Sequence, residues 1–443
     1  MFSALKNKKK IILKLSIILN VLLIVFTLLF FDFYKKRKIN QYNELFTSKN
    51  KEIKNIEEIL SYYYHNNEKF TFKTKKNEIV SKNKVNYFLN KIETNLYFSK
   101  QIGKSSAYID IKEYELYIAS ATGLFFKIDI RDYQNSIVKP KLIKSNIKNF
   151  IYDKRFFLNS YYGLKDILID NDNIFISFNN EIKDGCFNTG ILKAKIDKKF
   201  FEFSRFFDHT ECISAKSSKY KTFSVGQAGG RIVKFKDGYL LSHGSYSEFD
   251  EVQNSESIFG KILFINKNGR LIKIYSKGHR NPQGLEIFND DIIFETEHGP
   301  KGGDEINIIK EDKNYGWPIA SYGSNYKGQK FMDKFYPLPN SHKNFENPVK
   351  YFKNAIAISQ ILKVPKQFLN DDEDSLFLAS MKINKDYGEK INLFHFKYVN
   401  NELIIYDILP IGERIRDLIY DKKNNKIIMF LDTSASIGIL SIK

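Results

Sequence analysis

Two short groups of residues in this chain have the types and spacing needed to bind a carboxylate and a cation. Arg280 and Asn281 lie together in a turn-rich segment, and a guanidinium there presents a planar fork of donors that matches a carboxylate. Gly299 and Pro300 form a constrained turn that exposes backbone carbonyl oxygens, which are ligands that Ca²⁺ prefers. The segment 278–318 therefore predicts a site for an anionic ligand, with a calcium ion bound by the carbonyls of Gly299 and Pro300.

A second basic pair lies near the end of the chain. Arg414 and Arg416 are two residues apart in a strand-like segment, so we expect their side chains on the same face. Two guanidiniums on one face make a clamp for an anion. Asp304 and Glu305 either supply further oxygens to the predicted site or hold its loop in place.

The elements that must position these residues are short strands. From about residue 100 onward, apolar and polar residues alternate in short runs that Asp, Asn, Gly or Lys separate, which is typical of strand pairs. The clearest runs are 107–120, 167–178, 232–243, 262–275, 285–296, 400–409 and 418–432. A chain this long exceeds a single sandwich, whereas a propeller repeats small sheets without long exposed edges. The pattern predicts an all-β propeller over 101–443.

The N-terminal segment predicts a single transmembrane helix. Residues 11–33 are almost entirely apolar, and large aromatic and basic residues follow them where a cleaved signal peptide needs small ones. We therefore interpret 1–33 as a tail and uncleaved anchor, and 34–100 as a stalk and lead-in. Lysines flank the span almost equally on both sides, so charge alone leaves its orientation open.

Composition excludes little but is informative about partners. The formal net charge is +19, yet no basic run interleaved with aromatics lies outside the membrane flanks, so we predict no nucleic-acid binding. The two cysteines, Cys186 and Cys212, lack metal-binding spacing. They form either one disulfide or two unpaired core positions.

Three motifs in order carry a resemblance to a known family. GHRNPQGL (278–285), EHGPKGGDEIN (297–307) and NYGWP (314–318) resemble the glucose/sorbosone dehydrogenases, six-bladed β-propellers that depend on pyrroloquinoline quinone (PQQ). Further matches place the resemblance over roughly 100–443, and they are GLKD (163–166), GGRI (229–232), SMK (380–382) and ERIRD (413–417).

The resemblance implies a function and a set of site residues. It implies a membrane-anchored sugar dehydrogenase that oxidises an aldose at its anomeric carbon, using PQQ and Ca²⁺, with its propeller in the periplasm and an unknown electron acceptor. The residues implied to bind PQQ are Arg280, Asn281, Lys382, Arg414 and Arg416.

The chain departs from the family pattern where the chemistry is expected. The position of the family's base histidine is Gln227, four residues before Arg231, and an amide does not titrate near neutral pH. We take Gln227 and Arg231 as the candidate catalytic positions, with His209 and His243 as substitutes only if the loop follows another path. Lys353, Ala355 and Ser245 also replace expected residues. The alternative function is therefore a non-catalytic propeller of the same family that binds a glycan, another ligand or a protein, and a metal-dependent hydrolase is a more distant alternative.

Overall fold

The computed structural model describes residues 72–81, 85–94, 106–196, 199–216, 221–324 and 338–442, together with Phe30, Asp32 and Ser218. None of the helices in these ranges combines the length and the apolar composition that a membrane span needs. The predicted anchor at 11–33 lies outside the described residues except for Phe30 and Asp32, and so does the stalk up to residue 71.

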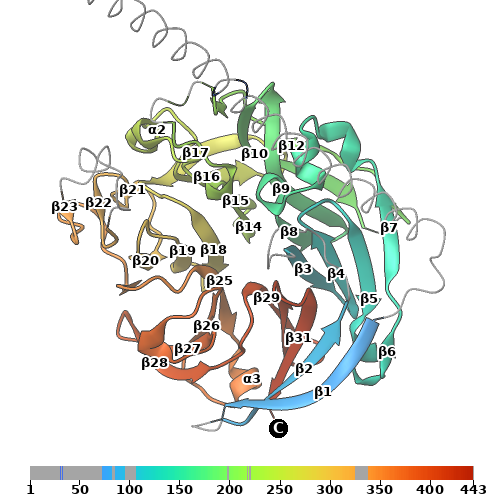
Figure 1. The fold of residues 1–443 in the computed structure, drawn as a ribbon. Helices are drawn as coiled ribbons and strands as arrows, with labels where there is room; N and C mark the ends of the chain where they lie inside the picture. The colour runs from blue at the N-terminus through green and yellow to red at the C-terminus, as the bar shows by residue number, and fades with distance from the viewer. Residues whose placement is uncertain are drawn as a thin grey trace, which may run out of the picture. The chain divides into compact units, whose positions relative to one another are not determined.

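In the described part of the chain, six sheets form a ring, each built on four antiparallel strands (Figure 1). The innermost strands of successive sheets contact one another in the order β3, β8, β14, β18, β25, β29, and β29 contacts β3 again. This arrangement is a six-bladed β-propeller, and it confirms the predicted fold class.

Blades 1 to 3 follow one another along the chain. Blade 1 contains β3 (Ala107–Lys112), β4 (Glu115–Ser120), β5 (Phe125–Asp129) and β7 (Lys141–Ser145), with β11 (Phe200–Phe201) at its edge. Blade 2 contains β8 (Leu164–Asp170), β9 (Asn173–Lys183), β10 (Cys186–Lys195), β12 (Ser204–Phe207) and β13 (Ile213–Ser214). Blade 3 contains β14 (Gly229–Phe235), β15 (Gly238–His243), β16 (Lys261–Asn266), β17 (Leu271–Lys277) and β21 (Lys313–Asn314).

Blades 4 to 6 complete the ring. Blade 4 contains β18 (Pro282–Ile287), β19 (Ile293–Glu297), β20 (Asp304–Ile308) and β24 (Lys350–Phe352), and β22 (Ala320–Ser321) pairs with β23 (Leu338–Pro339) in a separate small sheet. Blade 5 contains β25 (Ile358–Val364), β26 (Ser375–Ser380), β27 (Leu393–Val399) and β28 (Glu402–Leu409). Blade 6 contains β29 (Ile415–Asp421), β30 (Lys426–Leu431), β31 (Ser436–Ile442), β2 (Tyr87–Glu93), β1 (Phe72–Ser81) and β6 (Ile137–Val138).

Short helical turns connect the strands. The α-helices among the described residues are α2 (Phe249–Gln253) and α3 (Lys366–Leu369). The 3₁₀ turns are η1 (Ile130–Gln134), η2 (Ile147–Phe150), η3 (Lys154–Phe157), η4 (Ser160–Tyr162), η5 (Val225–Gln227) and η7 (Lys385–Tyr387).

Both ends of the described chain meet in the sixth blade. The C-terminal strand β31 pairs antiparallel with the N-terminal strand β2, from Tyr87 opposite Ile442 to Glu93 opposite Ser436. The expectation that residues up to 100 form only a lead-in is therefore wrong for 72–93, which supply two strands of a blade. Their Lys- and Asn-rich composition hid them, because β2 buries only part of its residues, among them Tyr87, Leu89 and Ile92.

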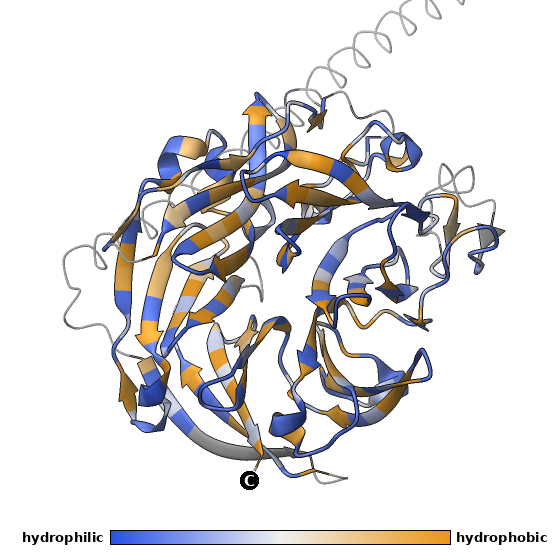
Figure 2. Cartoon of the chain, turned by 180° about the vertical axis from the view of Figure 1, so that it is seen from behind, coloured by the Kyte–Doolittle hydropathy of each residue, from blue (hydrophilic) through white to orange (hydrophobic). Residues whose placement is uncertain are grey.

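The core consists of apolar side chains packed between neighbouring blades. One cluster joins Phe175 and Ile191 of blade 2 to Ile232, Tyr239 and Leu263 of blade 3. Figure 2 shows the alternation of hydrophobic and hydrophilic residues along the strands that supplies these contacts. The strand pairs expected from that alternation are confirmed, except that 400–409 contributes the single strand β28 after a turn.

Polar hydrogen bonds join the innermost strands at every junction of the ring. At four junctions a carboxylate accepts a hydrogen bond from a backbone N–H of the adjacent blade. These N–H groups lie on the inner edge of a sheet, where no further strand pairs with them, so the carboxylate satisfies a donor that would otherwise be buried without a partner. The four pairs are Asp110 with Ile169 (2.5 Å), Asp166 with Ile232 (2.8 Å), Glu286 with Lys363 (3.1 Å) and Asp417 with Ile109 (2.9 Å). At the other two, Arg231 Nε donates to the Gln283 carbonyl and Ser359 Oγ donates to the Ile415 carbonyl.

Candidate functional site

A cavity of about 550 Å³ lies where loops and innermost strands of all six blades meet. Its lining includes Tyr108 from blade 1, Lys165 from blade 2, the turn at Gln227 that leads into blade 3, and His298 from blade 4. Blade 5 contributes Ala355 and Met381 on the loops beside its strands, and blade 6 contributes the arginine pair. Segments far apart in the sequence thus form one site.

Most of the residues predicted from the sequence line this cavity. They are Gln227, Arg280, Asn281, Gly299, Pro300, Lys382, Arg414 and Arg416. The structure therefore brings these residues together in one cavity.

Arg280 is held rigidly at the start of blade 4. Its backbone N–H donates to Glu297 Oε2 (2.5 Å), and its Nη1 donates to the His298 carbonyl (3.1 Å). Its guanidinium lies 5.3 Å from the ring centre of Trp317, in cation–π range. The NYGWP segment that carries Trp317 is a packed turn, as expected, with Tyr315 buried and Asn314 Oδ1 accepting from the Gly316 N–H.

The predicted arginine clamp is formed at the start of blade 6. Arg416 donates from Nε and Nη2 to Asp432 Oδ2 (3.1 and 2.8 Å), and Arg414 donates from Nη1 to the Met381 carbonyl (2.6 Å). Burial and then the neighbouring Arg416 charge lower the pKa of Arg414. Arg414 Nε is buried without a hydrogen-bond partner among the described residues, so a ligand oxygen would satisfy it.

The Gly299–Pro300 turn is fixed by Asp304. Asp304 Oδ1 accepts from the Gly299 N–H (3.1 Å), and Oδ2 accepts from the N–H groups of Ile356 and Ile358. These hydrogen bonds and nearby His298 lower the pKa of Asp304 although burial opposes them. A side chain at Gly299 would meet the Gly302 carbonyl at 2.1 Å, which explains the glycine. Of the two roles expected for Asp304, it therefore has that of holding the loop.

Arg231 does not line the cavity, so its assignment as a candidate catalytic residue is corrected here. It is 5% exposed, and its Nη1 donates to Asp166 Oδ1 (2.7 Å) and to Asp417 Oδ1 (2.8 Å). Because Asp166 lies on β8, Arg231 on β14 and Asp417 on β29, this side chain links three innermost strands. Its proximity to Gln227 in the sequence suggested a catalytic role. The alternation of side chains along β14 instead directs Arg231 toward the neighbouring innermost strands.

Neither substitute histidine reaches the cavity. His243 is fully buried, accepts from the Thr189 N–H at Nε2 (3.2 Å) and packs against Phe259, and burial lowers its pKa to about 3. His209 accepts from the Glu211 N–H and is absent from the cavity lining. Gln227 instead accepts from Ser245 Oγ (3.2 Å), so two of the altered positions contact each other.

Sequence reasoning missed two titratable groups in the cavity wall. His298 lies 3.9 Å from Asp304 Oδ1, and Lys165 Nζ donates to the Tyr161 carbonyl (2.8 Å). Burial and then the Arg416 charge lower the pKa of Lys165 to about 7. The GLKD motif contains Lys165, which is the second residue of the innermost strand β8. The sequence alone does not show that its side chain faces the cavity, because that depends on the register of the blade.

A second cavity of about 540 Å³ adjoins the first and shares Pro300, Ala355 and Lys382 with it. Lys353, one of the altered positions, lines this second cavity instead of the central one. Among the described residues, no carboxylate forms an ion pair with Lys382. Together the two cavities have a strongly basic lining.

A ring of six blades around a basic, loop-lined cavity defines a six-bladed propeller with a candidate ligand site at its centre. The sequence profile of the glucose/sorbosone dehydrogenase family matches residues 136–439, and the chain belongs to this family.

Characterised proteins and solved structures agree with this assignment. The chain is 28% identical over 281 residues to an aldose sugar dehydrogenase of Escherichia coli (strain K12), covering 58% of this chain and 71% of the relative. It is 41% identical over 75 residues to quinoprotein glucose dehydrogenase B of Acinetobacter calcoaceticus, covering 14% of this chain and 16% of that protein.

Two solved structures share the fold. The apo-form of the soluble aldose sugar dehydrogenase from Escherichia coli has a TM-score of 0.59 and 21% identity, covering 77% of this chain and 96% of that one. The PQQ-bound aldose sugar dehydrogenase from Streptomyces coelicolor has a TM-score of 0.55 and 16% identity, covering 84% of this chain and 98% of that one.

Proposed function

We propose that this chain binds PQQ in the central cavity and uses it to oxidise an aldose sugar at the anomeric carbon. The observation that carries the proposal is the convergence of Arg280, Lys382, Arg414 and Arg416 on one cavity of suitable size. Asp304 is the carboxylate of that lining, and backbone N–H groups already occupy both of its oxygens. The names of the relatives give the class of cofactor and substrate.

The residues present fit a planar tricarboxylate. Arg280 and Arg414 each donate to a backbone carbonyl, which fixes both guanidiniums in the cavity wall and preorganises this positive charge for carboxylate oxygens. Asn281 adds an amide, and Lys382 brings a positive charge from blade 5. When bound, PQQ accepts two electrons with the hydride of the sugar carbon.

We extend the proposal to a calcium ion at the Gly299–Pro300 turn. Both residues line the cavity, and Asp304 keeps their turn in one conformation. Backbone carbonyl oxygens are suitable Ca²⁺ ligands, so Gly299 and Pro300 would hold the ion. Asp304 contributes to the site by holding this turn through backbone hydrogen bonds.

Oxidation also needs a group that takes the proton of the sugar hydroxyl. Gln227 can orient that hydroxyl with its amide but does not titrate. We assign the proton to Lys165, which lines the same cavity and whose pKa of about 7 leaves much of it as the neutral amine at neutral pH. Its hydrogen bond to the Tyr161 carbonyl uses an N–H and leaves the nitrogen lone pair available.

A second candidate function is a propeller that binds an anionic ligand or glycan without turnover. Gln227 at the expected base position favours it, because the amide and Ser245 hydrogen-bond to each other in a neutral arrangement. This alternative keeps the arginine clamp and predicts binding without oxidation.

We also propose that residues 11–33 anchor the protein in the inner membrane, with the propeller in the periplasm. The apolar composition of that segment and the Cys186–Cys212 disulfide support this location, because disulfides persist in oxidising compartments. A reporter fused to the C-terminus tests the orientation directly.

The decisive experiment uses the full chain, purified in detergent and titrated with PQQ in the presence and absence of Ca²⁺. We expect stoichiometric binding, strengthened by Ca²⁺, and reduction of an artificial electron acceptor with at least one sugar from a panel of aldoses. Arg414→Met should weaken PQQ binding about 10- to 100-fold, since one or two charge-assisted hydrogen bonds are lost. Arg270→Met, at an exposed turn outside the cavity, is the matched control.

The outcomes separate the two functions. Tight PQQ binding with sugar oxidation supports the dehydrogenase. Tight binding without oxidation of any aldose supports the non-catalytic propeller, and failure to bind PQQ at all contradicts both the cofactor and the reaction.

A further inference from the structure

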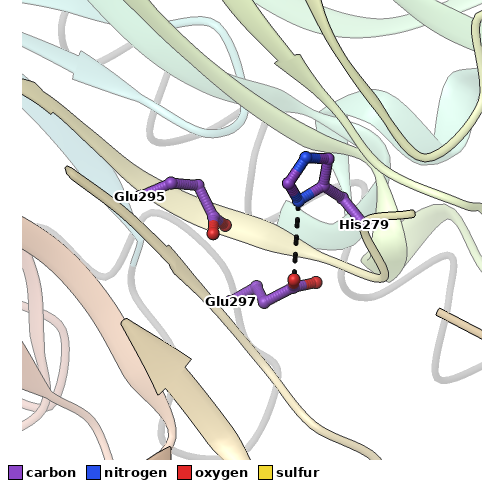
Figure 3. Close-up of side chains that lie close together, drawn as sticks. All are labelled: His279, Glu295 and Glu297. Carbon is purple, nitrogen blue, oxygen red and sulfur yellow. Dashed lines mark ion pairs between the residues drawn. The ribbon is translucent and has the colours of Figure 1, made fainter. Parts of the chain in front are cut away.

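A buried group of one histidine and two glutamates lies in blade 4, outside the central cavity. His279 immediately precedes the loop residue Arg280, and Glu295 and Glu297 are alternate residues of β19, so both carboxylates lie on one face of the strand. The ligand-capable atoms of the three side chains all lie within 4.8 Å of one another. Figure 3 shows the imidazole and the two carboxyl groups facing one another, with His279 Nδ1 and Glu297 Oε1 3.5 Å apart.

Two buried atoms of this group make no hydrogen bond within the described part of the chain. His279 Nδ1 and Glu295 Oε1 are both buried and have no hydrogen-bond partner among the described residues. The exposed fraction is 0% for His279, 0% for Glu295 and 4% for Glu297. Because proteins rarely leave a buried nitrogen and a buried carboxylate oxygen unsatisfied, this arrangement points to a missing ligand.

Contacts with Ser276 and Tyr315 fix the orientation of the His279 ring. Its Nε2 lies 2.9 Å from Ser276 Oγ, and its ring stacks on Tyr315 at 4.8 Å. The other ring nitrogen, Nδ1, faces the Glu297 carboxyl group and can bind a cation when Nε2 carries the proton. An outer hydrogen bond that fixes the tautomer in this way is the usual companion of a metal-bound histidine.

Apart from His279, the described hydrogen-bond donors to the two carboxyl groups are neutral. Among the described residues, no lysine or arginine side chain pairs with Glu295 or Glu297. Asn307 Nδ2 donates to Glu295 Oε2 (3.0 Å) and more weakly to Glu297 Oε1 (3.4 Å). The next acid along, Glu305, is already engaged by His342 (3.1 Å). Two buried carboxyl groups this close to each other need either a shared proton or a divalent cation between them.

We propose that His279, Glu295 and Glu297 bind one divalent transition-metal cation, and that Zn²⁺ matches the site best. An imidazole nitrogen with two carboxylate oxygens is a ligand set typical of zinc, whereas Ca²⁺ needs more oxygens than this group offers. Small side-chain shifts bring the three ligand atoms to a common centre, because they are already neighbours. This inference is independent of PQQ and of the proposed reaction.

The position of the site gives it a structural consequence for the cavity. Glu297 accepts from the Arg280 N–H through its other oxygen, and the carbonyl of the following residue, His298, accepts from the Arg280 guanidinium. A cation on Glu297 would therefore fix the wall that carries Arg280. The three ligands are positioning residues for the cavity and do not line it as a set.

The test measures metal content in the full chain without PQQ. The detergent-purified protein is stripped with a chelator, incubated separately with Zn²⁺, Mn²⁺ or Ca²⁺, desalted and assayed by elemental mass spectrometry. We expect one tightly held Zn²⁺ per chain and a higher Tm in its presence. Glu295→Gln should lose this equivalent of Zn²⁺ and the Tm increase, while Glu286→Gln should keep both, since Glu286 is a partly buried acid of β18 outside the group.

A second measurement does not depend on any variant folding. X-ray absorption of the zinc-loaded full chain should show one imidazole and oxygen ligands without sulfur. The proposal is overturned if the unmodified chain retains no stoichiometric Zn²⁺ or Mn²⁺, or if Glu295→Gln retains the same metal with the same Tm increase. A Glu295→Gln protein that is as stable as the unmodified chain, with neither responding to metal, would show that a proton holds the group together.

Discussion

The chemistry of this site depends on how single side chains are placed around a basic cavity. The residues that bind the cofactor in our proposal keep both their types and their positions, whereas the expected base is replaced by Gln227. Lys165 is a titratable neighbour on the same wall. In our proposal, sugar oxidation therefore depends on Lys165, to which the family motifs assign no catalytic role.

We predict that Lys165→Met lowers kcat/KM about 10²- to 10⁴-fold, the usual contribution of a general base. The base must be deprotonated, so kcat/KM of the unmodified protein should rise with pH and level off above about 7, where the lysine has lost its proton. Steady-state rates with saturating PQQ and Ca²⁺ measure both effects. Lys234→Met, which removes an exposed lysine paired with Asp170, is the control.

A double variant makes the test specific to proton transfer. Lys165→Met combined with Gln227→His should regain activity, with a rising limb near the pKa of about 6.5 of an ordinary histidine. If Lys165→Met alone retains rates within a few-fold of the unmodified protein, another group takes the proton.

At the scale of elements, the alternation of residues predicted the strand pairs, because turn residues separate them and one face of each strand is apolar. The motifs also identified Arg280, Arg414 and the Gly299–Pro300 turn. Other features needed three-dimensional register. Arg231 and Lys165 both lie on innermost strands, yet one joins the ring and the other faces the cavity. The contact between β2 and β31 spans almost the whole chain, and no local pattern encodes it.

The disulfide resolves an alternative that the sequence left open. Cys186 begins β10, and Cys212 directly precedes β13, which pairs with β10, so the bridge fixes a short outer strand to blade 2. Replacing both cysteines with alanine should lower the free energy of unfolding by about 3 kcal/mol, given the sequence separation of 26. Urea unfolding with and without reductant measures this. Reductant should destabilise the unmodified protein and leave the double variant unchanged.

At the scale of the propeller, Arg231 is a link across the ring. One guanidinium faces both Asp166 and Asp417, and burial raises the pKa of each carboxyl group. Each carboxylate also accepts a backbone N–H from the adjacent blade. The strength of the ring thus depends on this buried network as well as on apolar packing.

Arg231→Met should lower the free energy of unfolding by about 3–5 kcal/mol, because two buried carboxylates lose their counter-charge. A carboxyl group whose pKa is raised by folding destabilises the fold as pH increases, so the loss should be larger at pH 8 than at pH 5. Chemical denaturation at both pH values measures it. An equal loss at the two pH values would argue for a packing effect alone.

Closure of the ring by β2 gives a second prediction at this scale. A chain that starts at residue 69 keeps β1 and β2 and should show an unchanged Tm. A chain that starts at residue 95 leaves the edge of β31 unpaired and should aggregate or melt at a much lower temperature. Thermal unfolding and gel filtration of the two truncated chains test this, and equal stability would contradict the role assigned to the N-terminal strand.

The pairing of β2 with β31 also sets a schedule for biosynthesis. The strand β2 is among the first described parts to leave the ribosome, and its partner β31 ends at Ile442, so the sixth blade cannot form until Ile442 has been synthesised. At elongation rates of about 5–20 residues per second, that interval is roughly 20 to 70 seconds. During this interval the edge of β2 that later pairs with β31 has no partner. We expect the nascent chain to be protected from aggregation by chaperones or by the blades that have already formed.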